Sequence, residues 1–219
     1  MKYLRLLSTS ALWFSRADLL GDPLEGSLSQ PTIDRRDADP RAAWQANVRP
    51  HLPGMVYVSC WHCSDHESAA MWSLYSADHG LAVVTNGGLL RHALDQSELR
   101  LVFGLVKYVN YRTQLVDDTA AIDPFMHKRH SFEHEREVRA LALPIPTSED
   151  YVRDDDGNPR FDLMLPEGLE IPIEPATLIE VRLSPTAPSW YRDVVEDATR
   201  RYGFNFQVLQ SDLKTDALW

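Results

Sequence analysis

The sequence predicts a single α+β domain over residues 1–219. Strand-like runs are separated by helical segments without the regular alternation that builds a parallel sheet. A chain of 219 residues is long enough to bury one sizeable core. Its hydrophobic content of 44% and charged content of 25% are ordinary for a soluble globular protein. No internal repeat divides the chain.

Two strands are predicted in the first third of the chain, at residues 12–15 and 55–61, because both are apolar and aromatic runs bounded by turn residues. Residues 41–51 have a helical pattern that Pro53 and Gly54 would end. Loops are predicted at the turn-rich residues 21–26 and at the polar residues 31–40.

The middle of the chain is predicted to alternate between helix and strand. Ser64 and Glu67 have the spacing of a capping box. They predict a helix through Ala69, Met71, Trp72 and Tyr75 that ends before Gly80. A strand at 81–84, a turn at 85–88, a helix at 89–94 and one or two strands within 99–111 are expected to follow.

The last part of the chain begins with a weakly helical segment at 117–130, which Pro124 interrupts. A strand is predicted directly after Glu137, within 138–143. Residues 144–175 are rich in Pro and Asp and predict a loop or hairpin excursion within the domain. The end is predicted as a strand at 178–183, a helix at 189–202 and a strand at 204–210.

Charge and cysteine content narrow the class of protein. A net charge of -10 argues against a surface built for sequence-independent binding to nucleic-acid backbone. Two cysteines three positions apart do not make a disulfide scaffold, and a reducing cytoplasm fits them. The apolar N-terminal run is broken by polar and charged residues, which argues against export. No stretch approaches a membrane span.

Two acids two positions apart, Glu135 and Glu137, stand against the strand-like run that contains Arg139. In an extended segment these three side chains would share a face, with neighbours about 7 Å apart. One acid could then hold a sugar hydroxyl while the other activates a nucleophile. The alternative is a solvated strand edge, which charged runs commonly form. Spacing alone leaves both interpretations open.

The Cys60-Trp61-His62-Cys63 segment lies between a predicted strand and a predicted helix. A Cys-x-x-Cys at a helix start is the redox arrangement of thioredoxins, but the preceding βαβ pattern is missing. His62 and His66 suggest a zinc site, yet no second cysteine pair completes it. We therefore favour two small thiols buried beside a core strand, and no metal is predicted.

Four further residues have a possible binding role. Arg16, at the end of a strand, could grip a phosphate, or pair with Asp18 or Asp22 at the surface. Ser59 could form a hydrogen bond with a ribose or with a catalytic glutamate, or could be an ordinary structural hydroxyl. Trp72 and Tyr75 share a helix face and could stack on an aromatic ligand or pack in the core.

The order of the motifs resembles a bacterial family, the domain of unknown function 2971 family. The resemblance covers residues 12 to about 183. It is carried by the motifs Leu12-Trp13-Phe14-Ser15-Arg16, Asp22-Pro23-Leu24-Glu25-Gly26, Val58-Ser59-Cys60-Trp61, Met71-Trp72-Ser73-Leu74-Tyr75 and Phe132-x-x-Glu135-x-Glu137-x-Arg139. This family name implies no activity.

A weaker resemblance is to ADP-ribosyltransferases with an Arg–Ser–Glu signature. It implies a split, mostly antiparallel sheet with inserted helices and NAD as substrate, without a metal. Arg16 would bind the phosphates or ribose of NAD, and Ser59 would support the site. Glu137 would hydrogen-bond the nicotinamide ribose and stabilise the cation that forms on it, and Glu135 would orient or deprotonate the acceptor. Trp72 and Tyr75 are the candidates for stacking. The signature's Ser-Thr-Ser reads Ser59-Cys60-Trp61 here.

This resemblance implies an enzyme that transfers ADP-ribose to a protein, nucleic acid or small molecule, or that hydrolyses NAD. A bacterial toxin or phage-defence effector is the setting it implies. The alternative hypothesis is a non-catalytic sensor or interaction module. In that case Asp22, Glu25, Glu135 and Arg139 would form a buried charge network that holds loops together.

Overall fold

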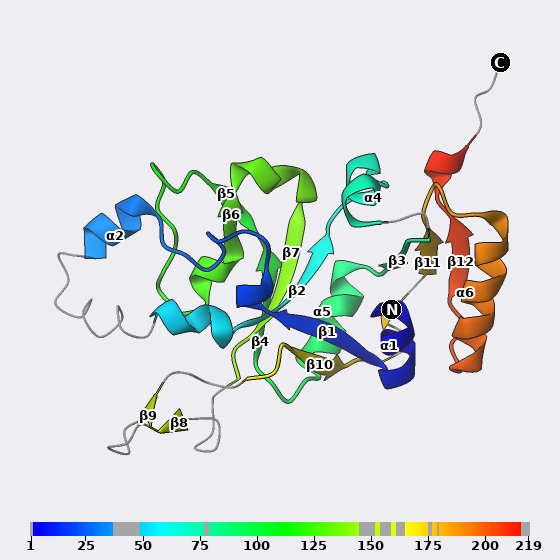
Figure 1. Cartoon of the computed structure of the whole chain (residues 1–219), viewed down its shortest axis with the longest axis horizontal. Helices are drawn as coiled ribbons and strands as arrows, with labels where there is room; N and C mark the ends of the chain where they lie inside the picture. The colour runs from blue at the N-terminus through cyan, green and yellow to red at the C-terminus, as the bar shows by residue number, and fades with distance from the viewer. Residues whose placement is uncertain are drawn as a thin grey trace. The chain divides into compact units, whose positions relative to one another are not determined.

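The computed structural model describes residues 2–36, 49–76, 79–144, 152–153, 159–160, 165–174, 177–178 and 180–215. Within these residues the chain is α+β with a mostly antiparallel main sheet and several helices, as predicted. It divides into two compact units (Figure 1): unit 1 comprises Met1–Leu12, Ser64–Ser97 and Glu170–Trp219, and unit 2 comprises Trp13–Cys63 and Glu98–Leu169. The prediction of one domain over residues 1–219 stays a prediction.

A five-stranded sheet, most of which belongs to unit 2, has the order β10-β1-β2-β7-β4. Its strands are β1 (Ala11–Arg16), β2 (Tyr57–His62), β4 (Leu101–Leu105), β7 (Glu137–Ala142) and β10 (Gly168–Pro172). Strand β7 pairs antiparallel with both β2 and β4, and β1 pairs antiparallel with β2. The strands predicted at 12–15, 55–61 and 138–143 are therefore confirmed.

The register of β2 against β7 decides which side chains share a face of the sheet. Cys60 lies opposite Arg139, and Ser59 lies opposite Ala140. Directly opposed residues point to the same side of an antiparallel sheet, and successive residues point to opposite sides. The Arg139 face also carries Val58 and Leu141, which belong to a core cluster with Ala17, Leu52, Val56 and Phe125.

The remaining elements of unit 2 are short. They are η1 (Ala17–Leu19), α2 (Gln30–Arg36), η2 (Arg49–Gly54), β5 (Lys107–Val109), η3 (Asp123–Met126), β6 (His127–Arg129), η4 (His130–Glu135), β8 (Val152–Arg153) and β9 (Pro159–Arg160). Strands β5 and β6 are parallel, and β8 and β9 form an antiparallel pair inside the predicted excursion.

The loop predicted at 31–40 is wrong over its first part, because α2 begins at Gln30. Pro31 is tolerated there, since the first turn of a helix has no partner for the missing N–H. Most of the helix predicted at 41–51 lies outside the described residues, and 49–51 begin a 3₁₀ segment instead. The weakly helical segment at 117–130 contains only the 3₁₀ turn η3, with Pro124 near its start, before β6.

Unit 1 contains a three-stranded sheet of order β12-β11-β3. Its elements are α1 (Lys2–Thr9), α4 (Ala69–Tyr75), β3 (Leu81–Val84), α5 (Gly87–Asp95), β11 (Glu180–Leu183), α6 (Ser189–Arg201), β12 (Gln207–Gln210) and η6 (Asp212–Lys214). Strands β11 and β12 are parallel, as strands joined by a crossover helix can be, and β3 is antiparallel to β11. The strands and helices predicted between 81 and 94 and after 178 are confirmed.

Two features of unit 1 differ from the sequence analysis. Helix α1, with Leu6 and Leu7 buried, was not predicted. The predicted capping box is wrong, because the residue that caps the start of α4 is Ser68 and not Ser64. The Ser68 hydroxyl accepts from the Met71 N–H. The Glu67 carboxylate instead accepts from the Trp72 indole N–H.

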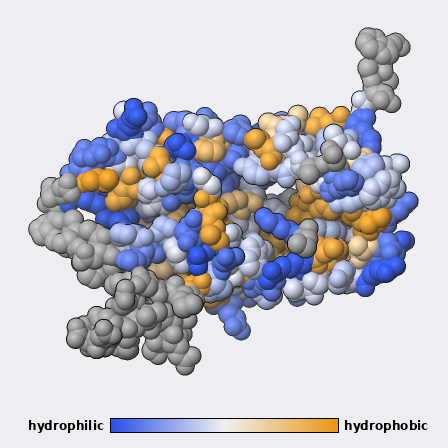
Figure 2. Space-filling model, in the orientation of Figure 1, coloured by the Kyte–Doolittle hydropathy of each residue, from blue (hydrophilic) through white to orange (hydrophobic). Residues whose placement is uncertain are grey.

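The surface of the described residues is mixed in character. Figure 2 shows hydrophilic residues over much of the face in view, with hydrophobic atoms between them. Among the helices that the structure describes, none combines the length and the apolar character that crossing a membrane requires.

Candidate functional site

Arg139 lies in the middle of β7 with none of its surface exposed. A buried guanidinium is stable only where acceptors surround it. Its Nε donates to Glu137 Oε1 at 2.8 Å. Its Nη2 donates to Glu137 Oε2 at 3.0 Å and forms an ion pair with Glu25. Its Nη1 donates to the Phe125 carbonyl oxygen at 2.7 Å. Every nitrogen of the guanidinium therefore has an acceptor.

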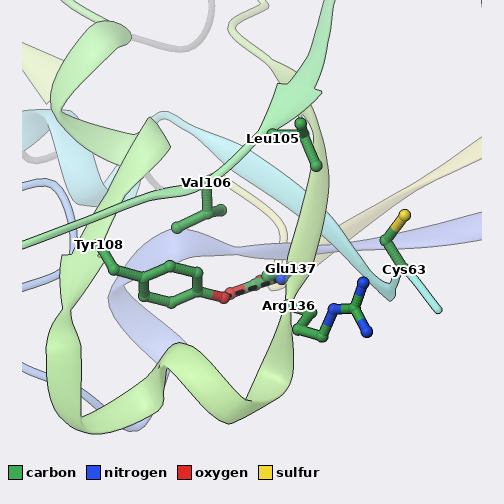
Figure 3. A pocket seen from close by; sticks show the side chains of 6 residues that line it. All are labelled: Cys63, Leu105, Val106, Tyr108, Arg136 and Glu137. Atoms are coloured by element: carbon green, nitrogen blue, oxygen red, sulfur yellow. Dashed lines mark hydrogen bonds between the residues drawn. The ribbon is translucent and has the colours of Figure 1, made fainter.

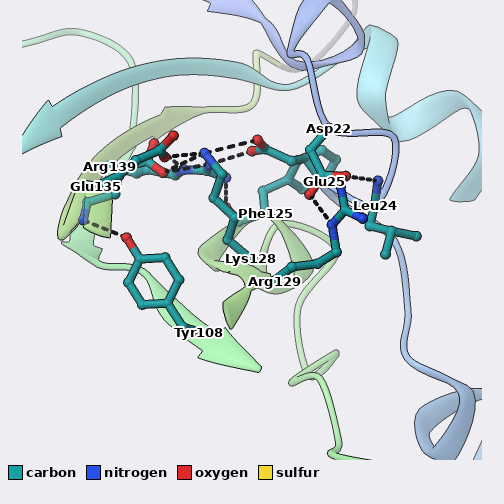
Figure 4. Close-up of polar contacts among 10 residues, drawn as sticks. Asp22, Leu24, Glu25, Tyr108, Phe125, Lys128, Arg129, Glu135 and Arg139 are labelled. Atoms are coloured by element: carbon teal, nitrogen blue, oxygen red, sulfur yellow. Dashed lines mark hydrogen bonds and ion pairs between the residues drawn. The ribbon is translucent and has the colours of Figure 1, made fainter. Parts of the chain in front are cut away.

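Lys128, from β6, supplies the second buried cation. Its ammonium lies 2.5 Å from Glu135 Oε2, 3.3 Å from Glu137 Oε2 and 3.4 Å from Glu25 Oε1. An ammonium has three N–H donors, so three carboxylates can satisfy it. We name Glu25, Lys128, Glu135, Glu137 and Arg139 the Arg139 cluster; each exposes 7% or less of its surface (Figure 4).

Glu135 and Glu137 both contact Lys128, but not because they lie two positions apart on one strand, as the spacing predicted. Glu135 ends the 3₁₀ segment η4, and only Glu137 belongs to a strand. Arg136 between them is left-handed, with φ 43° and ψ 56°, and this turn brings both acids to Lys128. The His62 ring fixes the turn further, because its Nδ1–H donates to the Glu135 carbonyl at 2.6 Å. The shared face predicted for Glu137 and Arg139 is confirmed.

The loop of residues 22–26 carries Glu25 into the cluster. Asp22 forms an ion pair with Arg129 at 2.8 Å and accepts from the Leu24 N–H at 3.1 Å. Gly26 has φ +78°, and a Cβ there would overlap the Phe125 ring. Only glycine fits both restrictions, so the close packing of this loop on Phe125 depends on Gly26.

The charges of the cluster stabilise one another. Burial alone would raise the pKa of the Glu137 carboxyl, but the hydrogen bonds and charge of Arg139, together with Lys128, hold it below its ordinary value. Burial would lower the pKa of Lys128, but its carboxylate partners raise it. Lys128 and Glu137 are therefore both charged at neutral pH.

A pocket of about 160 Å³ adjoins the cluster at the start of β7. It is lined by Cys63, Leu105, Val106, Tyr108, Arg136 and Glu137, and we name it the Tyr108 pocket (Figure 3). The Glu137 N–H donates to the Tyr108 hydroxyl oxygen at 2.8 Å. Pockets for drug-sized ligands and cofactors measure roughly 300–1,000 Å³, so this pocket suits a much smaller molecule.

Arg16 and Ser59 do not join Glu137. Arg16 lies opposite Tyr57 and shares a face of the sheet with Ser59, whereas Glu137 and Arg139 are on the other face. Arg16 pairs with Asp18 at 2.7 Å, as its structural alternative predicted, and also donates to the Leu165 carbonyl. The Ser59 hydroxyl accepts from the Trp61 indole N–H at 3.1 Å. The Arg–Ser–Glu convergence that the resemblance implies is therefore not found.

Trp72 and Tyr75 lie in α4, which belongs to unit 1, while the cluster belongs to unit 2. The Trp72 indole is half-buried and donates to Glu67 at 2.7 Å, so its polar group has a structural partner. Tyr75 is 66% exposed. Neither observation assigns these two aromatic residues to a ligand.

The favoured interpretation of Cys60 and Cys63 as buried thiols is wrong, because both are free and exposed. Desolvation by the surrounding protein and the nearby Glu137 carboxylate raise the pKa of the Cys60 thiol, which keeps it protonated at neutral pH. Helix α4 begins only at Ala69, so Cys63 is not at a helix start. Within the described ranges no group of three or more His, Cys, Asp or Glu residues could hold a metal.

Sequence reasoning missed Lys128, Tyr108 and Arg136. One signal was available for a buried cluster, because Arg139 interrupts an otherwise apolar strand and a buried arginine requires acids. Those acids were named in the alternative hypothesis. Lys128 had no comparable signal, since its burial depends on the pairing of β6 with β5.

Comparison of the chain with protein-family models, with characterised proteins and with solved structures found no match to any of them.

Proposed function

We propose that the chain is a non-catalytic interaction module in which the Arg139 cluster is structural. One observation carries this proposal: each carboxylate of the buried cluster contacts a cation of the same cluster. A catalytic carboxylate must instead be within hydrogen-bond reach of a reacting group. Both oxygens of Glu137 already contact Arg139, and Oε2 also contacts Lys128.

The segments that the cluster joins support the same proposal. Glu25 comes from the loop after η1, Lys128 from β6, Glu135 from η4, and Glu137 and Arg139 from β7. Three of these four segments overlap two of the motifs that carry the resemblance to the domain of unknown function 2971 family.

The transferase hypothesis lacks such support. It needs Arg16 and Ser59 on the side of the sheet that carries Glu137, and the register puts them on the other side. It also needs room for a dinucleotide, whereas the pocket beside Glu137 has a volume of about 160 Å³. Cleavage of NAD is the competing hypothesis, and the test below distinguishes it from the proposal.

The test measures nicotinamide release from NAD by the purified chain, together with thermal unfolding of Glu137→Gln. We expect no release above the buffer blank and a melting temperature lowered by several degrees, because the substitution leaves two buried cations short of one negative charge. Glu133→Gln is the matched control, since its side chain is 69% exposed. Release of nicotinamide that Glu137→Gln abolishes would overturn the proposal.

A further inference from the structure

We propose that the Tyr108 pocket binds a small carboxylate with a short apolar tail. The inference rests on the proposed function in one respect: Glu137 is occupied by Arg139 and Lys128 and does not itself receive the ligand. The pocket offers two hydrogen-bond donors, Tyr108 and Arg136, beside two apolar side chains, Leu105 and Val106.

The Tyr108 hydroxyl is the first donor. Its oxygen accepts the Glu137 N–H at 2.8 Å, so its own proton must point elsewhere. No acceptor for that proton is seen among the described residues. Desolvation raises the pKa of this phenol, and the nearby Glu137 and Glu135 charges add to the increase. The hydroxyl thus keeps its proton at neutral pH and can donate it to a ligand in the pocket.

Arg136 is the second donor. It is exposed, and no described residue forms an ion pair with it. Its left-handed backbone, with φ 43°, is uncommon for a residue with a side chain and carries a local cost in free energy. The conformation directs the guanidinium along the pocket wall toward Cys63 (Figure 3). A guanidinium binds a carboxylate through two parallel N–H donors.

The size and walls of the pocket define the rest of the ligand. Leu105 is 67% exposed although it is a large apolar residue, and Val106 beside it is nearly buried. A cavity of about 150 Å³ can hold benzene, so about 160 Å³ has room for roughly six non-hydrogen atoms. Butyrate has that size and unites a carboxylate with an apolar chain.

The arrangement does not favour a small cation. Glu137 is the one acid that lines the pocket among the described residues, and its oxygens are engaged by Arg139 and Lys128. A cation would meet the free Arg136 guanidinium, which repels it. Inorganic phosphate would pair with Arg136 but would gain nothing from Leu105 and Val106. A carboxylate with an apolar tail can use both the donors Tyr108 and Arg136 and the apolar side chains Leu105 and Val106.

The experiment titrates the full chain with butyrate and follows the backbone amides of Val106, Tyr108 and Glu137 by NMR. We expect saturable shifts at these amides with a dissociation constant in the millimolar range. Butyramide and inorganic phosphate should bind about tenfold more weakly or not at all. Arg136→Gly should weaken butyrate binding at least about tenfold without unfolding the chain, because glycine accepts the left-handed backbone. The exposed Arg112→Gln is the matched control and should bind like the wild type.

Three outcomes would overturn the inference: shifts that do not saturate, equal binding of butyrate by Arg136→Gly, or tighter binding of phosphate than of butyrate. These outcomes are separate from a failure of the proposed function. Nicotinamide release would refute the non-catalytic proposal even if butyrate binds. Lack of butyrate binding would leave the structural role of the Arg139 cluster intact.

Discussion

Two carboxylates, Glu137 in unit 2 and Glu67 in unit 1, each tie together distant segments, but by different means. Glu137 is held by the cations Arg139 and Lys128. Glu67 accepts mainly from uncharged donors: the Trp72 indole at 2.7 Å, the Ser211 hydroxyl at 2.6 Å and the Asp212 N–H at 2.7 Å. The cation that pairs with it, Arg182, is 3.4 Å away and also pairs with Glu180.

The two sites differ in whether they require the negative charge of the carboxylate. The Trp72 indole and the Ser211 hydroxyl both donate to Glu67 Oε2, so one neutral amide oxygen could still accept from both. The Asp212 N–H, which donates to Oε1, would lose its acceptor but lies at the surface, where water can replace it, so the site of Glu67 tolerates loss of the charge at a small cost. The site of Glu137 does not, because two buried cations depend on it. A carboxylate among buried cations stabilises the fold through its charge. A carboxylate among neutral donors stabilises it through the positions of its acceptor oxygens.

The largest effect is expected for Arg139→Met, which breaks the cluster. It leaves Glu25 and Glu137 with one buried cation between them and the Phe125 carbonyl without its donor. Such a loss costs about 3–5 kcal/mol, or a fall in melting temperature of roughly 10 °C or more. Urea and thermal unfolding measure it, with Arg136→Met as control. A change below about 1 kcal/mol would show that the cluster does not stabilise the fold.

The second prediction compares Glu137→Gln with Glu67→Gln. We expect the first to lower the free energy of unfolding by about 2–3 kcal/mol and the second by about 1 kcal/mol or less. Urea unfolding of both variants under one set of conditions measures the difference. Equal losses would mean that neutral donors depend on the charge of their acceptor as much as cations do, and the distinction between the two sites would fail.

The third prediction concerns acid. The pKa of Glu137 is below its ordinary value of 4.5 in the folded protein. A depressed folded pKa gives stability that is present above the unfolded value and is lost as the pH falls through the folded value. The wild type should therefore lose stability below about pH 4.5 more steeply than Glu137→Gln. Urea midpoints from about pH 6 to 3 test this; parallel curves would contradict it.

The smallest effect is expected where an ion pair lies at the surface. Arg201 and Asp197 on α6 form an ion pair, with 2.8 Å between Arg201 Nε and Asp197 Oδ2 and with side chains 77% and 51% exposed. Solvent and salt weaken such pairs, so Arg201→Ala should change stability by less than about 0.5 kcal/mol. The same unfolding assay serves. A loss comparable to that of Glu137→Gln would mean that burial is not what separates the two classes of pair.

Much of the local structure and part of the site could be predicted from the order of residues alone. Alternation along β7 predicted that Glu137 and Arg139 share a face, because strand side chains repeat every two residues. The alternative hypothesis of a buried network of Asp22, Glu25, Glu135 and Arg139 anticipated three members of the Arg139 cluster, whereas Asp22 pairs with Arg129.

Which residues contact one another depends on how distant segments pair in the folded chain. The register of β1 and β7 on β2 separated Arg16 and Ser59 from Glu137, and a one-residue change of register would have reversed this. The left-handed turn at Arg136 brought Glu135 to Lys128, and the pairing of β6 with β5 buried that lysine. These are long-range pairings and a single strained dihedral angle, and neither is encoded in the spacing of residues along the chain.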